Sequence, residues 1–563
     1  MDARRSRGLA AALAVAGAML AGAVACEAGT PVTLAHLWVR DARGLVGKVA
    51  GLAGRVAPEA GAMVTARAAG MLDGPEWAGM DWGRPVSVAL VRGSAFESPV
   101  PAVVAFLPVA DAERFRQARE AAGGQGETLD LRGDVALLSD RAEALKLVTP
   151  KMLEYMRGTP ALAAKGDLYF TVYVARVVEE CRPLIDAALG PGAGTEEVAA
   201  GPALMATDPL LKLAGSQLRR LSLAVQLGEQ ALEMCGRLYP LEGSPLAGLV
   251  EAQRGGTPDL DRHLPANAAL ALAARLDVAK LKPLLQAVLE ACGPALVPPE
   301  DQAKLIAFYD PAVLTGEFAF AASGAPAHRG IQTLQLARVR DAAAFRRAAA
   351  GYLPWAMSAP SRALAPGGKS KVEHTPAARD HGGTGVDRIT VSLPQTQEAE
   401  AIALMPQLPP QVAEIAAAED VAVVTHNNAD GSLIDAALDH IAGGGGNTQG
   451  HGALRVARAA AWPNANVVFQ LSFSRLLGKA AEEAGRVVPM LAPALAPMVP
   501  PPGRDETPVT GCVLCSSGSV SFRVCIPWEP LIALGSRVAE AVKQKPPGGM
   551  PGAELPGEGP AEF

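Results

Sequence analysis

One pattern of hydrophobic and polar residues recurs along the chain. A short run of alternating or β-branched residues ends in a polar residue or Pro, and apolar residues at helical spacing follow. The run 34–39, for example, is followed by Asp41 and then by Leu45, Val46 and Val49. A period of two predicts a strand, and spacing of three or four predicts an amphipathic helix. The chain therefore predicts seven strand-to-helix units, with strands at 34–39, 103–109, 168–174, 270–276, 334–339, 467–473 and 520–526.

The polar residue at each junction has a mechanical explanation. An Asp or Ser that leaves a strand can accept hydrogen bonds from the unpaired N–H groups at the start of a helix. This role accounts for the carboxylates at the junctions without any catalytic function. The expected N-caps are Asp41, Asp111, Asp277, Asp341 and Ser474.

Local sequence matches indicate an internal duplication. The motif Asp-x-x-x-Phe-Arg begins at Asp111 and again at Asp341, and the strand-like segment 134–139 matches 420–425. Twenty residues separate Phe115 from the first of these strands, but 76 separate Phe345 from the second, so the second copy carries about 56 extra residues. We expect a signal peptide (1–25), two modules (26–255 and 256–500, the latter with the insertion), a C-terminal strand hairpin and helix (501–544) and a disordered Pro/Gly tail (545–563).

The repeated units predict an α+β fold, with antiparallel curved sheets and helices packed on one face. Residues 217–238 read as two antiparallel strands, whereas 443–452 and about 358–384 read as flexible loops. The strand-to-Asp helix starts and the paired Asp-Val-Ala strands resemble those of exported, internally duplicated bacterial proteins that are grouped as a domain of unknown function. That resemblance implies export and this fold, and it supplies no catalytic residues.

The N-terminus has the layout of a secretion signal. Three Arg within the first seven residues precede an uncharged stretch, 8–24, and Ala23-Val24-Ala25 offers a small-x-small cleavage site before Cys26. Cys26 resembles the acylated cysteine of a bacterial lipoprotein, which would tether the protein to a membrane. Plain cleavage and an uncleaved anchor stay open as alternatives, and all three place the mature chain in the periplasm or at the cell surface.

Composition excludes some classes of function. The formal charge of the 563 residues is −6, and it becomes −8 without the signal segment, so a nucleic-acid partner is not expected. Aromatic residues make up 4% of the chain, which disfavours a stacking platform for sugars or bases.

The cysteines and glycine-rich segments offer few candidate sites. Cys512 and Cys515 have the spacing of a redox pair but lie beside a turn, so a structural disulfide between them is favoured over free thiols, redox activity or a metal site. The segment 367–370 lacks the first Gly of a phosphate-binding loop. The eight His form no metalloprotease motif, and His426, the most site-like of them, precedes an ordinary turn sequence.

These observations predict a non-catalytic, membrane-tethered envelope protein that binds a protein partner or an apolar ligand, with no cofactor or metal. Two alternatives remain: a hydrolase whose site is assembled between the repeats, and a lipid carrier with a wide apolar cavity.

Overall fold

The computed structural model describes most of the chain, and all statements below concern the described residues. The expected signal, Cys26, most of the 443–452 loop and the 545–563 tail lie outside them. The described residues are 32–92, 96, 100–123, 127–157, 166–182, 207–253, 256–292, 299–323, 331–364, 371–392, 410–428, 430–443, 452–487, 507–516 and 518–543.

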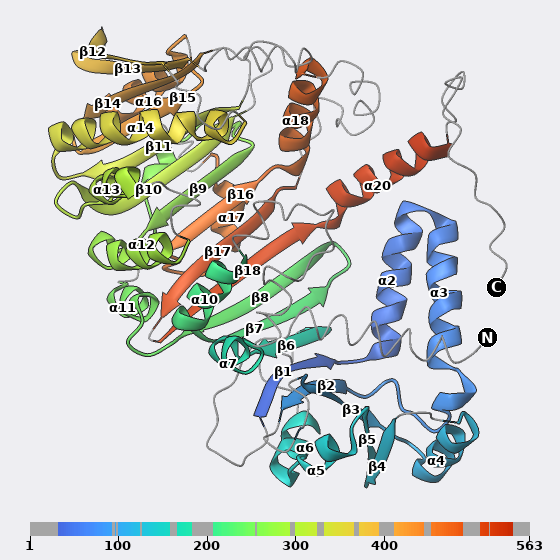
Figure 1. Ribbon diagram of the computed structural model, residues 1–563. Coiled ribbons are helices and arrows are strands. Elements are labelled where there is room, and N and C mark those ends of the chain that lie inside the picture. Colours follow the sequence, from blue (N-terminus) through green and yellow to red (C-terminus); the bar gives the residue numbers. More distant parts are fainter. Residues whose placement is uncertain are drawn as a thin grey trace.

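Within these residues, eighteen strands form one antiparallel, unclosed sheet that runs across the whole molecule (Figure 1). From one edge to the centre, the first half of the sheet contains β4 (Thr128–Arg132), β5 (Val135–Ser139), β3 (Ala102–Pro108), β2 (Val86–Arg92), β1 (Val32–Val39), β6 (Leu168–Val172), β7 (Leu218–Leu227) and β8 (Ala231–Pro240).

The second half continues from β8 to the opposite edge. Its strands are β18 (Ser519–Pro527), β17 (Val509–Ser516), β16 (Val467–Leu471), β9 (Leu270–Arg275), β10 (Leu314–Ser323), β11 (Gln332–Val339), β15 (Val421–His426), β14 (Gln411–Ala418), β13 (Thr384–Ser392) and β12 (Lys371–His381).

The two halves repeat one chain path. Strands β1 to β8 have the same pairing order as β9, β10, β11, β14, β15, β16, β17 and β18, and the last strands of the two copies, β8 and β18, pair antiparallel. Because β8 and β18 are equivalent strands and pair antiparallel, an approximate two-fold axis relates the two halves. The axis passes near the paired residues Cys235 and Arg523, which occupy equivalent positions in the two strands. The α+β fold with duplicated strand-helix units is thus confirmed.

Most helices repeat in the same order. The first half contains α2 (Ala42–Val56), α3 (Pro58–Leu72), η1 (Pro75–Trp77), α4 (Ala112–Ala121), α5 (Ala142–Lys146), α6 (Pro150–Arg157), α7 (Val174–Glu180), α10 (Thr207–Gln217) and α11 (Pro245–Ala252). The second contains η3 (Leu260–His263), α12 (Val278–Cys292), α13 (Pro299–Phe308), α14 (Ala342–Leu364), α16 (Ser432–Ala442), α17 (Arg455–Ala460), α18 (Phe473–Val487) and α20 (Trp528–Lys543). Of these, η1, α10 and η3 have no counterpart among the described residues of the other half.

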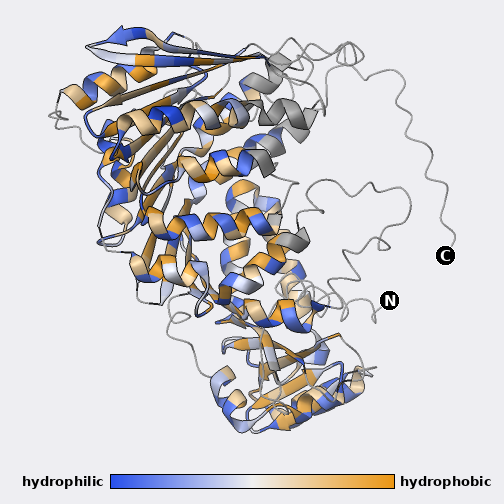
Figure 2. Cartoon of the chain, turned by 60° about the vertical axis from the view of Figure 1, so that its left-hand side comes forward, coloured by the Kyte–Doolittle hydropathy of each residue, from blue (hydrophilic) through white to orange (hydrophobic). Residues whose placement is uncertain are grey.

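Helices cover both faces of the sheet, whereas the sequence analysis placed them on one. Val421 and Val423 of β15 pack in a cluster with α16 and α17, while Ala422 and Val424 of the same strand pack in a cluster with α13 and α14. We call the first face A and the second face B; α5 and α6 lie on face A in the first half, and α4 lies on face B. Figure 2 shows apolar and polar residues alternating along most elements.

Four of the five expected N-caps are present. The side chains of Asp41, Asp111, Asp277 and Asp341 accept hydrogen bonds from backbone N–H groups three residues later, at 2.7 to 3.2 Å. The fifth prediction was wrong by two residues: α18 begins at Phe473, and the hydroxyl of Ser472 accepts the hydrogen bond from the N–H of Arg475.

The insertion in the second copy contains a strand hairpin. Strands β12 and β13 pair along residues that the sequence analysis had assigned in part to a flexible loop. Strand β12 lies at the sheet edge, with most of its residues exposed. Glu414, which is 1% exposed, forms ion pairs with Arg379 at 3.1 Å and with Arg388 at 2.7 Å, and this network fixes the hairpin to β14.

The sheet also groups the C-terminal elements with the second copy. Strands β17 and β18, which the sequence analysis set apart as 501–544, occupy the places that β7 and β8 occupy in the first half. The β7–β8 hairpin itself is confirmed as two antiparallel strands. Within the described residues, no helix combines the length and apolar character needed to cross a bilayer.

Candidate functional site

A row of aromatic and basic residues crosses face A of the first half. Arg220 on β7 pairs with Tyr239 on β8. The last residue of β6, Val172, pairs with Leu221, so Tyr173, which follows Val172, lies beside Arg220. The Arg220 guanidinium lies 3.9 Å from the centre of the Tyr239 ring, a cation–π distance. It is also within hydrogen-bonding reach of the hydroxyls of Tyr173 and Tyr239.

A second, more buried row lies beside it. His36, Thr171 and Ser222 are paired across β1, β6 and β7, and each is less than 5% exposed. The hydroxyls of Thr171 and Ser222 are 3.0 Å apart, and that of Thr171 also donates to the Tyr169 hydroxyl at 2.9 Å. These side chains satisfy one another, so the row forms a polar floor inside the sheet face.

His36 is enclosed by rings. Its ring centre lies 4.2 Å from that of Trp38, 5.3 Å from Tyr155 and 5.8 Å from Tyr173. Burial, followed by the positive charge of Arg220, lowers the pKa of His36 from 6.5 to about 3. The imidazole is therefore neutral at physiological pH, and its Nε2 shares a hydrogen bond of 3.3 Å with the hydroxyl of Tyr155.

Tyr155 connects this interior to the surface. It lies on α6, which is held over β1 because the Trp38 indole N–H donates to the carbonyl of Met156 at 3.2 Å. The side chain of Tyr155 is 45% exposed. A tyrosine that reaches the surface thus places its hydroxyl against a buried imidazole. We call Tyr155, Tyr173, Arg220 and Tyr239, with His36 beneath them, the arginine–tyrosine cluster.

Positive charge dominates the surroundings of the cluster. Arg237 hydrogen-bonds Tyr239 and donates to the hydroxyl of Ser521 at 3.3 Å, and the guanidinium of Arg219 lies 6.0 Å from the Tyr239 ring. Burial raises the pKa of the Tyr239 phenol, but the hydrogen bond from Arg237 and the charges of Arg220 and Arg237 outweigh that effect and lower it. The groups that shift the pKa values of His36, Tyr155, Tyr173 and Tyr239 are arginines and tyrosines, and no carboxylate is among them.

The second half carries no such cluster at its equivalent positions. The correspondence is fixed by two shared contacts: Asp167 accepts from the N–H of Leu227, and Asn466 accepts from the N–H of Cys515, both at 2.7 Å. From that register, His36, Tyr173, Arg220, Arg237 and Tyr239 correspond to Ala271, Ser472, Pro508, Cys525 and Pro527. The scaffold is repeated, but the charge and the aromatic rings are not.

The sequence analysis missed this cluster. Its members are spread from residue 36 to residue 239, and they meet because β6 lies between β1 and β7. One signal was available: the chain contains six Tyr, and four of them, Tyr155, Tyr169, Tyr173 and Tyr239, are gathered here. In an aromatic-poor chain, three of these tyrosines within 19 residues mark the segment.

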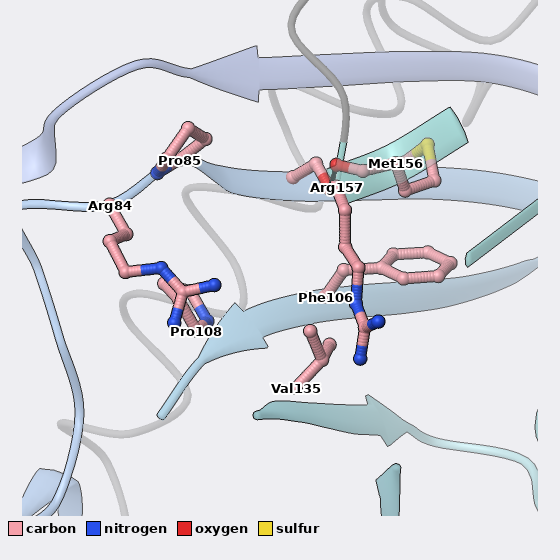
Figure 3. A pocket seen from close by; sticks show the side chains of 8 residues that line it. Arg84, Pro85, Phe106, Pro108, Val135, Met156 and Arg157 are labelled. Carbon is pink, nitrogen blue, oxygen red and sulfur yellow. Dashed lines mark hydrogen bonds between the residues drawn. The ribbon is translucent and has the colours of Figure 1, made fainter. Parts of the chain in front are cut away.

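A small cleft nearby also contains two arginines (Figure 3). Arg84 and Arg157 flank it above Phe106 and Val135, and both form ion pairs with Asp134, at 2.6 and 2.8 Å. The hydrogen bond from Arg84 is the main cause that lowers the pKa of Asp134. The cavity volume is about 30 Å³, which is the room that one water molecule takes. The cleft is therefore too small for a ligand, and its two arginines are bridged by Asp134.

The expected disulfide between Cys512 and Cys515 is absent, and both thiols are free. The two residues lie on one strand, β17, three positions apart, so their side chains leave opposite faces of the sheet and cannot bond to each other. Burial raises the pKa of both thiols, that of Cys515 to about 11, which keeps them protonated and unreactive.

The remaining histidines form no reactive centre in the described part of the chain. His426 ends β15 with its Nε2 buried and without a hydrogen-bond partner, and burial lowers its pKa to about 4. The residues after it start α16, as an ordinary turn would. Across the described ranges, no three His, Cys, Asp or Glu side chains are placed to share a metal ion.

Comparisons with protein-family models, with curated proteins and with solved structures give no match to this chain. The resemblance to exported, duplicated bacterial proteins therefore stays a prediction.

Proposed function

We propose that this chain is a non-catalytic binding protein of the cell envelope, and that it binds its ligand at the arginine–tyrosine cluster. The observation that carries this proposal is the difference between the halves. A duplicated scaffold keeps the residues that the fold needs in both copies, such as Asp167 and Asn466. The cluster occurs in one copy only among the described residues, so the repeated fold does not require it.

The chemistry of the cluster favours binding over hydrolysis. A general base needs a pKa near the operating pH, whereas His36, with a pKa of about 3, is a poor proton acceptor. Its described hydrogen-bond partner is the phenol of Tyr155, and no carboxylate orients the imidazole. Arginine and tyrosine are, in contrast, the residues that most often dominate binding surfaces.

The lipid-carrier alternative gains no support from the described cleft. Pockets that enclose a drug-sized ligand have volumes of about 300–1,000 Å³. The cleft beside Arg84 offers about 30 Å³.

The proposed site of action is the periplasm or the cell surface, with a lipid on Cys26 as the tether. This part rests on the N-terminal sequence pattern. Membrane fractionation of the full chain and of a Cys26→Ser variant tests it: the variant should move to the soluble fraction, and unchanged membrane retention would exclude the lipid tether.

Site-specific photo-crosslinking in cells that produce the protein tests the binding site. A photoreactive amino acid at Tyr155 on α6, which is 45% exposed, should give a discrete adduct. The matched control is Val456 on the equivalent helix α17, which is 38% exposed. Adducts of equal yield at both positions, or at neither, would contradict the proposal.

A further inference from the structure

We propose that the arginine–tyrosine cluster binds an oxyanion, a phosphate or carboxylate group of its ligand, with Arg220 as the central cation. This inference rests on the proposed binding function and names the chemistry of the ligand. Three observations carry it: an incomplete set of hydrogen bonds, an uncompensated charge, and two tyrosine hydroxyls within hydrogen-bonding reach of the guanidinium.

The hydrogen bonds of Arg220 are incomplete. Its Nε–H is buried and has no acceptor. A buried donor that is left unpaired destabilises the folded chain, and the cost is greater for a charged group. Two other arginines that lie against the sheet do not share this condition: Arg338 of β11 donates its Nε–H to Glu317 at 3.2 Å, and Arg346 of α14 donates its Nε–H to Asp387 at 2.9 Å. Arg220 thus lacks the acceptor that its counterparts have.

The charge of Arg220 is also uncompensated. Buried cations are normally paired, because removing a charge from water without a counter-ion is costly. Among the described residues, no carboxylate forms an ion pair with Arg219, Arg220 or Arg237. The ring of Tyr239 and the hydroxyls of Tyr173 and Tyr239 supply weaker, cation–π and dipolar stabilisation instead. A ligand with negative oxygens would provide both the missing acceptor and the missing charge.

The neighbouring groups are suited to an oxyanion. The guanidinium fork matches the geometry of carboxylate and phosphate oxygens. The hydroxyls of Tyr173 and Tyr239 lie beside the guanidinium as further donors, and burial raises the pKa of Tyr173, which keeps that phenol neutral. Arg237 brings a second cation to the same edge. The aromatic rings leave an apolar wall for the body that carries the anionic group.

Calorimetric titration of the purified full chain at constant ionic strength tests the inference. Three probes separate the sources of the anion: inorganic phosphate, acetate, and vesicles of phosphatidylcholine with phosphatidylglycerol. We expect saturable binding of at least one probe, and a loss of at least tenfold in affinity in Arg220→Gln. The matched control is Arg84→Gln, because Arg84 already has Asp134 as its partner, and it should bind as the unaltered chain does.

A second variant distinguishes a loss of binding from a failure of Arg220→Gln to fold. Combining Tyr173→Phe with Tyr239→Phe keeps the rings and the charge of Arg220 but removes two hydroxyl donors, and it should weaken binding several-fold. Equal affinity in the unaltered chain and in Arg220→Gln, or no binding of any probe, would overturn the oxyanion inference. A specific crosslink at Tyr155 together with that result would leave the binding function standing, whereas loss of the crosslink would remove the binding function itself.

Discussion

The two halves of the sheet follow the same path but differ in what they place on it. In the second half, Ala271 and Ala273 of β9 pack under η3 with Leu260, in a hydrophobic cluster. In the first half, the equivalent positions are His36 and Trp38, which lie under Tyr155 of α6. The small side chains of β9 leave room for η3, while the large rings of His36 and Trp38 lie beneath Tyr155. The comparison separates residues that form the scaffold from residues that have another role.

The helical pairs that follow the first strand of each copy differ in a similar way. Helices α12 and α13 bury Val278, Leu289, Leu305 and Phe308, whereas Gly61 is the one fully buried residue of α2 and α3. Gly61 is needed there because a Cβ would come within 3.0 Å of the backbone of Gly54. In Figure 1 the α2–α3 pair stands apart from the sheet, beside α20. The α2–α3 pair is thus less buried than the equivalent α12–α13 pair.

The largest expected effect concerns the shared scaffold. Phe115 and Phe345 occupy the same place in the two copies, and each is at most 1% exposed. Replacing either with Ala should lower the free energy of unfolding by about 3–5 kcal/mol, because a buried ring leaves a cavity. Urea unfolding measures this effect. A large loss in the free energy of unfolding for one Phe and almost none for the other would contradict the structural equivalence of the two halves.

The helical pairs should respond unequally. Leu289→Ala in α12 removes a side chain that is 5% exposed, and it should cost about 2–5 kcal/mol. Val49→Ala in α2 removes one that is 39% exposed, and it should change stability by no more than about 0.5 kcal/mol. Thermal and urea unfolding of both variants check the contrast. Similar losses would mean that α2 is packed in the folded protein as tightly as α12.

A further effect is a pH dependence of stability to which His36 of the first half contributes. The pKa of His36 is about 3 in the folded chain and 6.5 in the unfolded chain. As the pH falls, the unfolded state therefore takes up the proton before the folded state does. The contribution of neutral His36 to the free energy of unfolding is present above pH 6.5. It is lost as the pH falls toward 3, at up to about 1.4 kcal/mol per pH unit.

A titration of stability against pH between 7 and 4 measures that slope. His36→Gln should reduce that slope. An unchanged slope in His36→Gln would show that the imidazole is not held neutral. His263 and His426, whose pKa values fall to about 4, add the slope that remains.

Local signals in the sequence predicted much of the fold. The seven strands and four Asp caps follow from residues that are neighbours in the chain. Strand β12 was missed because its exposed residues, with Pro376 and several charges, have no apolar alternation. The second helical face was missed because the buried strand β15 reads as a continuous apolar run, which does not reveal that both faces are covered. The arginine–tyrosine cluster depends on the pairing of β6 with β1 and β7, which no local pattern encodes.

The most direct test of the central claim is a crystal structure of the full chain soaked in tungstate, a tetrahedral oxyanion with strong anomalous scattering. We expect β8 and β18 to join two superimposable halves, with an anomalous peak against Arg220 and none at the equivalent Pro508 and Pro527. Halves with different strand orders, or peaks that avoid Arg220, would contradict the account.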